Sequence, residues 1–108
     1  MNKLELNDKV AELYNKADSL FYVTEMDDLK QPVMNEVLLI DDWNRLMDLA
    51  VDNKIFEVFE CRQTDNYFSL RNRANLQYTI ILNKDHESPQ EATRYAIAMA
   101  LVKLAEDK

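Results

Sequence analysis

The chain contains no glycine in 108 residues, and this absence limits both its backbone and the chemistry it can support. Glycine is the residue that most readily takes positive φ or lets a backbone lie against a ligand. P-loops, dinucleotide-binding fingerprints, EF-hand loops and the G-x-S-x-G nucleophile elbow all need it. The sequence therefore excludes these four kinds of site. Its turns are expected to depend on Asn and Asp, which occur in VDNK, QTDNY, RNRAN and LNKD.

The length and composition are those of one folded domain. Apolar residues make up 47% of the 108 residues and charged residues 31%, and a chain of this size can bury a core without metals or disulfides. A single cysteine, Cys61, excludes an internal disulfide and suits a reducing compartment. No apolar run is long enough to span a bilayer, and the first residues, MNKLELNDK, lack the apolar stretch of a signal peptide. We expect one domain, residues 1–108, in the cytosol and without membrane contact.

The net charge of −7 lies in the first half of the chain. Residues 1–53 carry 5 basic and 12 acidic side chains, whereas residues 54–108 carry 8 of each. An acidic first half repels phosphates and so disfavours nucleic-acid binding. It allows either an acidic face for a basic protein partner or a solvated surface that maintains solubility. The side chains that such a face would present are Glu25, Asp27, Asp28, Asp41 and Asp42.

Residues 1–40 are expected to contain one helix followed by a connection. An apolar stripe at helical spacing predicts the helix, with Asn7 as its N-cap. The stripe comprises Leu6, Val10, Leu13, Tyr14 and Ala17. Leu20 and Phe21 continue it, so the helix is expected to run beyond Ala17. Residues 22–39 show no sustained period and are interpreted as a connection, with room for a short strand or helical turn.

A second helix is expected inside IDDWNRLMDLAVDN. Its apolar residues fall at i, i+3, i+4 and i+7, which are Trp43, Leu46, Met47 and Ala50. Asp41 or Asp42 is expected to cap its start, and Asp52–Asn53 to end it. Trp43 lies on the apolar stripe, which predicts a buried core anchor rather than a binding residue.

The apolar period then changes from helical spacing to two, which predicts three strands. They are KIFEVFECR, NYFSLRN and LQYTIILN, and the short Asn-containing turns between them indicate an antiparallel meander. The first and third strands are apolar on both faces, so each needs cover on both sides or cover on one side and a partner on the other.

The last helix has the clearest start signal in the chain. Ser88, Pro89 and Glu91 form a capping box with proline at the first helical position. The following YAIAMALV is apolar almost all round the helix, and its alanines allow close approach to a sheet. Residues 41–108 are thus predicted to form an αβββα core. The fold class is α+β, a three-stranded antiparallel β-meander with three or more helices packed against it.

No set of residues has the spacing of a catalytic or metal site. Zinc needs four ligands, and the chain offers one histidine, His86, and one cysteine, Cys61. A Cys61–His86 pair has no third residue marked to orient it. Adjacent residues on a helix point about 100° apart, so Asp27–Asp28 and Asp41–Asp42 are not natural catalytic dyads. We expect no catalytic residue, no cofactor, no metal and no enzymatic activity.

Residues 61–84 carry basic side chains among aromatic ones. The basic residues are Arg62, Arg71, Arg73 and Lys84, and Asp65 is the one acid among them. With Tyr67 and Tyr78 nearby, such a sheet could bind single-stranded nucleic acid by stacking. We favour the other interpretation, in which these residues balance the acidic helices of the same fold.

The order helix, three strands, helix over residues 41–104 resembles the phage ABA sandwich family of small phage and prophage proteins. The resemblance is carried by DDWNRLMDLA leading into FEVFEC. It is also carried by SPQEATRYAIAMAL, which looks like that family's Ser- or Thr-Pro start and alanine-rich helix with an early arginine, here Arg94. The resemblance implies helices packed on a small antiparallel sheet and a phage or prophage origin. It implies no activity, and residues 25–39 lie outside it.

These observations lead to the hypothesis of a non-enzymatic phage-type protein that binds another protein in the host cytosol. One form is an acidic inhibitor of a host nucleic-acid-binding or defence protein, with carboxylates where phosphates would lie. A first alternative is a self-assembling structural or accessory protein, in which the YAIAMALV helix or an apolar sheet face pairs with its own copy. A second is a single-stranded nucleic-acid-binding accessory protein that uses residues 61–84.

Three substitutions test this interpretation of the helix starts. His86→Ala should change stability little, because Ser88 and Glu91 already satisfy the start of the last helix. Ser88→Ala should cost about 1 kcal/mol by freeing an amide, and Trp43→Ala about 3–5 kcal/mol if its ring is buried. Thermal melts of the three variants would rank them. A ranking with His86→Ala as the most damaging change would contradict the interpretation.

Overall fold

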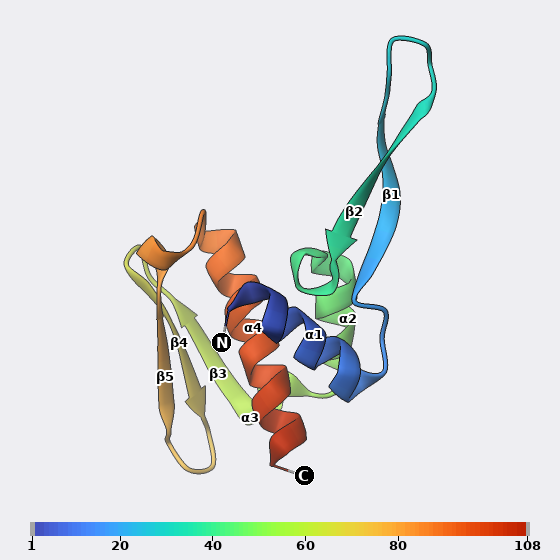
Figure 1. Ribbon diagram of the computed structural model, residues 1–108. Helices are drawn as coiled ribbons and strands as arrows, with labels where there is room; N and C mark the ends of the chain where they lie inside the picture. The colour runs from blue at the N-terminus through green and yellow to red at the C-terminus, as the bar shows by residue number, and fades with distance from the viewer. Residues whose placement is uncertain (1, 108) are drawn as a thin grey trace.

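The alanine-rich segment forms the central helix of the fold. The structure, a computed structural model, describes residues 2–107, and of Thr24 only the backbone. Helix α4 (Pro89–Glu106) lies between two helices on one side and a sheet on the other (Figure 1). Its fully buried face is largely alanine: Ala92, Ala96, Ala98 and Ala100 are all 0% exposed. Small side chains let its neighbours pack close to its backbone, as the sequence predicted.

The sheet that covers α4 is the predicted three-stranded meander. Strands β3 (Phe59–Gln63), β4 (Tyr67–Asn72) and β5 (Tyr78–Leu82) pair antiparallel in the order β3-β4-β5. The inner face buries Phe59, Phe68, Leu70 and Ile81. A 3-10 turn, η2 (Asn83–Asp85), then leads to the start of α4. The α+β class and the antiparallel meander are confirmed.

The first predicted strand begins later than expected. Residues Ile55–Val58 form a single helical turn, α3, and only then does β3 start. Lys54 takes the left-handed conformation (φ 54°), which ends the preceding helix and turns Ile55 into the core. Because IFEV is a short run in which three of the four residues are apolar, its sequence alone does not distinguish a helical turn from a strand.

The second predicted helix is confirmed, but the position of its tryptophan was wrong. Helix α2 (Trp43–Asp52) is capped by Asp42, whose side chain accepts a hydrogen bond from the Arg45 amide. Leu46, Leu49 and Ala50 are buried. Trp43 is 41% exposed and lies beside the Arg94 guanidinium, 5.9 Å from the ring centroid. As the first residue of α2, Trp43 lies at the end of the helix, so its truncation should cost less than a buried ring would.

The first helix starts and ends earlier than predicted. Helix α1 (Lys3–Tyr14) is capped by Asn2, whose Oδ1 accepts from the Glu5 amide at 2.9 Å. The helix ends where Asn15 takes the left-handed conformation. Its buried residues are Leu6, Asn7, Val10 and Ala11, and it packs against α4. The N-terminal helix therefore contributes to the same core as residues 41–108.

Asn7 lies inside α1, where it joins three parts of the chain. It is 1% exposed. Its Nδ2 donates to the Asp18 carbonyl at 2.9 Å, and its Oδ1 accepts from the Ile40 amide at 3.0 Å. The Asp18 carbonyl also accepts from the Leu39 amide at 2.9 Å. Asn7 was predicted to be an N-cap and is instead a buried clamp on both ends of residues 18–40.

The segment interpreted as a connection is a β-hairpin. Strands β1 (Ser19–Met26) and β2 (Pro32–Leu38) pair antiparallel, from Ser19 opposite Leu38 to Met26 opposite Pro32. The register shifts between Val23 and Glu25, which is a β-bulge. The bulge interrupts the period of two, and apolar residues occupy both faces, so alternation is not visible in the sequence. The 3-10 turn η1 (Leu39–Asp41) then leads to α2.

The turns use asparagine differently from the prediction. Among residues 2–107, the residues with positive φ are Asn15, Lys30, Lys54 and Leu76, and only the first of these is an asparagine. In the β4–β5 turn, the Asn72 and Asn75 side chains accept hydrogen bonds from the amides of Ala74 and Gln77. Asparagine thus holds this turn through its side chain, while a neighbouring residue takes the left-handed conformation.

The Asn7 clamp gives a stability prediction. Asn7→Ala leaves the Ile40 amide without its acceptor inside the core, and removes one of two donors to the Asp18 carbonyl. We expect a loss of about 2–4 kcal/mol in urea unfolding. Hydrogen exchange of residues 18–40 should also accelerate more than exchange in α4. Asn2→Ala is the control, because it removes an exposed cap worth about 1 kcal/mol. A loss for Asn7→Ala no larger than for Asn2→Ala would contradict the clamp.

Candidate functional site

The hairpin projects from the body of the molecule as an arm. We define the arm as residues 19–38, strands β1 and β2 with their turn. Figure 1 shows it extending away from the helices, and the molecule measures 56 × 32 × 22 Å. In the described part of the chain β1 and β2 pair only with each other, and no third strand joins them. Both outer edges of the arm therefore present backbone groups that another strand could pair with.

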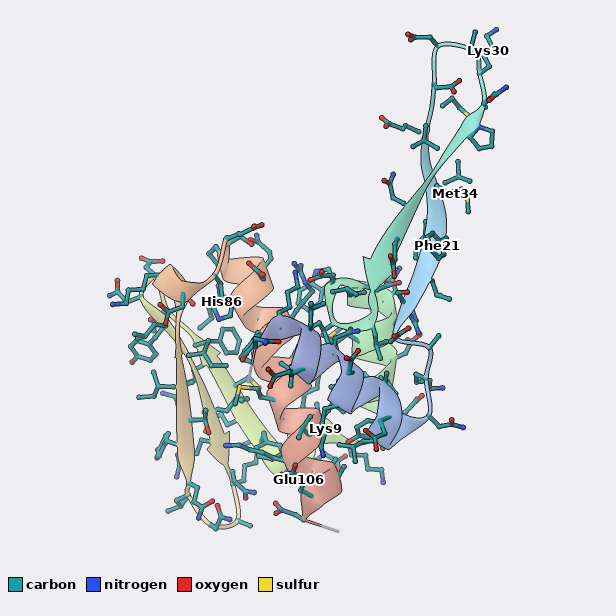
Figure 2. The ribbon with its side chains drawn as sticks, viewed as in Figure 1. Lys9, Phe21, Lys30, Met34, His86 and Glu106 are labelled. Carbon is teal, nitrogen blue, oxygen red and sulfur yellow. The ribbon has the colours of Figure 1, made fainter. Side chains whose placement is uncertain are left out.

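One face of the arm is an exposed apolar surface. Phe21 is 62% exposed, Val23 55% and Met34 53%. Val23 lies opposite Met34 in the register, and Phe21 is two residues from Val23, so the three share a face. Figure 2 shows Phe21 and Met34 on the projecting strands, away from the helices. Such a surface on a protruding element is typical of a contact site.

The arm is acidic as well as apolar. Its charged residues are Glu25, Asp27, Asp28, Lys30 and Glu36, a net charge of −3. Asp27 holds the turn, because its Oδ1 accepts from the amides of Leu29 and Gln31. Among residues 2–107, the four salt bridges include no acidic side chain of the arm.

The root of the arm is fixed to the body by hydrogen bonds. The Tyr22 hydroxyl donates to Asp42 Oδ2 at 2.7 Å, and this bond to a carboxylate raises the pKa of the tyrosine. Asp42 also caps α2, so one carboxylate joins the arm to that helix. Arg45 Nη2 donates to the Ala17 carbonyl at 2.7 Å, just before β1.

The predicted acidic residues fall in two places. Glu25, Asp27 and Asp28 lie at the far end of the arm. Asp41 and Asp42 lie at its root, where Asp41 pairs with Lys3 at 2.8 Å. The two groups do not form one continuous acidic face, and both members of the root pair already have partners in the chain.

The outer face of the sheet gathers arginines and tyrosines. Arg62 and Arg71 lie there with Tyr67, Tyr78 and Ile80, around a hollow of about 240 Å³. The Arg71 guanidinium lies 5.6 Å from the centre of the Tyr78 ring. The cover that the apolar pattern of β5 leads us to expect on both sides is present only on the inner side, since Tyr78 and Ile80 are each 61% exposed on the outer face.

One carboxylate on this sheet face lies among several arginines. Glu60 pairs with Arg62 at 2.9 Å and with Arg71 at 3.7 Å. The hydrogen bond from Arg62, together with the charges of Arg73 and Arg71, lowers the pKa of Glu60. Arg73 follows β4, and Lys84 lies in η2 beyond the other end of β5. The structure therefore brings together Arg62 and Arg71, with Arg73 close by, and leaves Lys84 apart.

His86 lies in a hollow that sequence reasoning missed. The hollow, about 530 Å³, is formed by β5, the start of α1 and the first half of α4. The His86 and Tyr95 ring centroids are 4.8 Å apart. Glu91, also in its lining, accepts from the Glu87 amide at 2.6 Å, and this bond lowers the pKa of the carboxyl. The three elements are distant in sequence, so no local signal marks their meeting.

The same contacts correct one half of the predicted capping box. Ser88 Oγ accepts from the Glu91 amide at 3.1 Å, as predicted. The Glu91 carboxylate was expected to accept from the Ser88 amide and instead accepts from Glu87, one residue further back. Its other oxygen lies 3.6 Å from Lys3 Nζ, which draws the side chain toward α1.

Cys61 is a half-buried thiol. Burial raises its pKa from 9.0 to about 11, and the charge of Arg73 opposes this shift without reversing it. At neutral pH the side chain is therefore a thiol rather than the reactive thiolate. It lies on β3 and packs against the hydrophobic core.

Within residues 2–107, no group of three or more His, Cys, Asp or Glu side chains is placed to hold a metal ion. None of the helices in this range has both the length and the apolar character needed to cross a bilayer. Comparison with family models, curated proteins and solved structures gave no match. The resemblance to the phage ABA sandwich family stays a prediction.

The buried thiol gives a pH-dependence prediction. Alkylation of Cys61 by iodoacetamide in the folded chain should be slow at neutral pH and should keep rising with pH beyond 9, toward about 11. The chain unfolded in urea is the control, and its rate should level near the ordinary thiol pKa. Folding raises this pKa, so the unfolded chain loses the thiol proton at a lower pH than the folded chain does. The thiol's contribution to the stability of the folded chain is therefore present below pH 9 and is lost as the pH rises toward 11. A folded-state rate that levels below pH 9 would contradict this.

Proposed function

We propose that the chain is a non-enzymatic protein-binding module that acts through its arm. The observation that carries this proposal is the exposed apolar face of Phe21, Val23 and Met34 on a hairpin that projects from the body. The function is thus assigned to residues 19–38, most of which were interpreted from the sequence as a connection.

The energetics of a free hairpin support a binding role. A two-stranded hairpin is marginally stable in water, and a third strand or a packed surface is what usually stabilises one. Here the apolar face is in solvent and both edges are open. A partner that covers this face or adds a strand would bury apolar area at about 25 cal/mol per Å² and satisfy the edge by β-augmentation.

The charge of the arm indicates the kind of partner. Glu36 lies opposite Phe21 on the apolar face, Glu25 pairs with Val33, and Asp28 lies in the turn. None of the three is in a salt bridge among residues 2–107. A surface that combines apolar and basic side chains would complement the arm. In the phage or prophage setting that the sequence resemblance implies, an acidic inhibitor of a basic host protein is one form of this function.

A second candidate function uses the sheet face. Arg62 and Arg71 share one face with Tyr67 and Tyr78, as a single-stranded nucleic-acid-binding sheet requires. Glu60 on the same face, and the net charge of −7, oppose it. We therefore rank this function below the arm.

A crosslinking experiment tests the proposed function. A photoreactive phenylalanine analogue is placed at Phe21, or as a control at Val51 of α2, which is also 62% exposed. Irradiation of bacterial cells that express each chain should give a discrete crosslinked protein from position 21 and none from position 51. Adding Met34→Asp to the Phe21 chain should abolish that crosslink, because the substitution places a charge within the apolar face.

The outcomes separate the two candidate functions. Equal crosslinking from positions 21 and 51 would contradict an arm-specific contact. Arg71→Glu should leave crosslinking of the arm to a host protein unchanged. Binding of purified chain to single-stranded DNA at low salt, lost with Arg71→Glu and kept with Met34→Asp, would instead favour the nucleic-acid function.

A further inference from the structure

We propose that the arm's partner is the outer sheet face of a second copy of this chain, so that copies assemble head to tail. The inference rests on the proposed function, since it names the partner of the same arm. It follows from two surfaces on one chain whose charge and apolar character match.

The receiving surface is the hollow on the outer face of β3, β4 and β5. Tyr67, Tyr78 and Ile80 give it an apolar lining, and its volume of about 240 Å³ is on the scale of one inserted side chain. The charge around it is positive, because Arg62, Arg71 and Arg73 all lie close enough to lower the pKa of the one carboxylate, Glu60. This surface can therefore accept an apolar side chain with acidic neighbours.

The arm presents such a group. Phe21, the most exposed side chain of the apolar face, lies opposite Glu36 in the β1–β2 register. An aromatic ring and a carboxylate are thus adjacent on one face of the arm. Insertion of Phe21 among the tyrosines would place Glu36 near Arg62 and Arg71, whose only salt-bridge partner among the described residues is Glu60. The arm carries net −3 in total, so the charges of the two surfaces are opposite.

The positions of the two surfaces decide the symmetry of the assembly. Figure 1 shows the arm and the three-stranded sheet at opposite ends of the molecule, with the helices between them. A contact between two different surfaces is heterologous, and it produces an open chain unless the rotation between copies closes a ring. Each copy would then offer one free arm and one free sheet face. The assembly should therefore grow beyond a dimer as concentration rises.

Complementation between two blocked variants tests this arrangement. The arm variant carries Phe21→Asp and Met34→Asp, and the sheet variant carries Ile80→Asp. These three side chains are 62%, 53% and 61% exposed, so the substitutions leave the core intact. Val51→Asp, at a position 62% exposed on α2, is the matched control. Circular dichroism and thermal melts confirm the fold of each, and Arg71→Glu serves as a second sheet variant.

Sedimentation velocity over a concentration series measures the result. The wild type and Val51→Asp should form species larger than a dimer, and each blocked variant alone should stay at the monomer mass of 12.7 kDa. A 1:1 mixture of the arm and sheet variants should form a heterodimer and nothing larger, because one intact arm meets one intact sheet face. The apparent affinity in this mixture should fall at least tenfold when the sheet variant also carries Glu36→Lys.

Four results would overturn the inference. They are a wild type that stays monomeric throughout, a mixture that stays monomeric, an arm variant that assembles as well as the wild type, and a blocked variant that dimerises alone, which would show a symmetric contact. A monomeric wild type together with a host protein crosslinked at position 21 would overturn self-assembly and leave the proposed binding function standing. Assembly unaffected by the arm variant would overturn the inference, and absence of any arm-specific crosslink would separately overturn the function.

Discussion

The arrangement of this molecule depends on one buried amide. Asn7 donates to the carbonyl of Asp18, just before β1, and accepts from the amide of Ile40, just after β2. Both ends of a segment of more than twenty residues are thus held on one side chain in α1, which itself packs on α4. The bond to the Ile40 amide is buried and the bond to the Asp18 carbonyl is partly buried. Water therefore competes little with the first bond. These bonds fix the position of the arm's root on the body of the molecule.

Because the root of the arm is fixed to the body, the apolar residues of the arm are held away from the core and stay exposed to solvent. The core is formed by α4 with its small side chains, by α1 and α2, and by the inner sheet face, and among the described residues it takes none from β1 or β2. The apolar residues of the arm therefore lie in solvent at one end of the molecule, while arginines and tyrosines gather on the sheet at the other. The two proposals, that the arm binds a protein and that its partner is the sheet face of a second copy, both depend on this separation.

Elements with a local signal could be predicted, and elements without one could not. Ser88 and Pro89 fix the start of α4, and alternation in YFSLRN fixes the inward residues of β4, Phe68 and Leu70. The hairpin was missed because a β-bulge interrupts its alternation and apolar residues occupy both of its faces. Only part of the candidate site was predicted. The acidic residues near the arm's tip and the arginines of the sheet were named as candidates, whereas Phe21 was assigned to a helix. Asn7 was wrongly predicted to be an N-cap because an asparagine at the start of an apolar stripe favours a cap. The residues around it do not distinguish a cap from a buried asparagine inside the helix.

The sequence by itself determined the α+β class, the meander, the central alanine-rich helix and the exclusion of glycine-dependent ligand sites. These follow from periodicity, capping and backbone freedom, which act over a few residues. Only the tertiary structure decided that residues 19–38 project, that Trp43 lies at the surface, and that Lys54 and Leu76 take left-handed conformations costing about 1–2 kcal/mol each. It also decided which charges meet: Arg62 and Arg71 share Glu60, and the carboxylates of the arm have no basic partner among residues 2–107. These outcomes depend on contacts between residues far apart in the chain, and such contacts leave no local pattern.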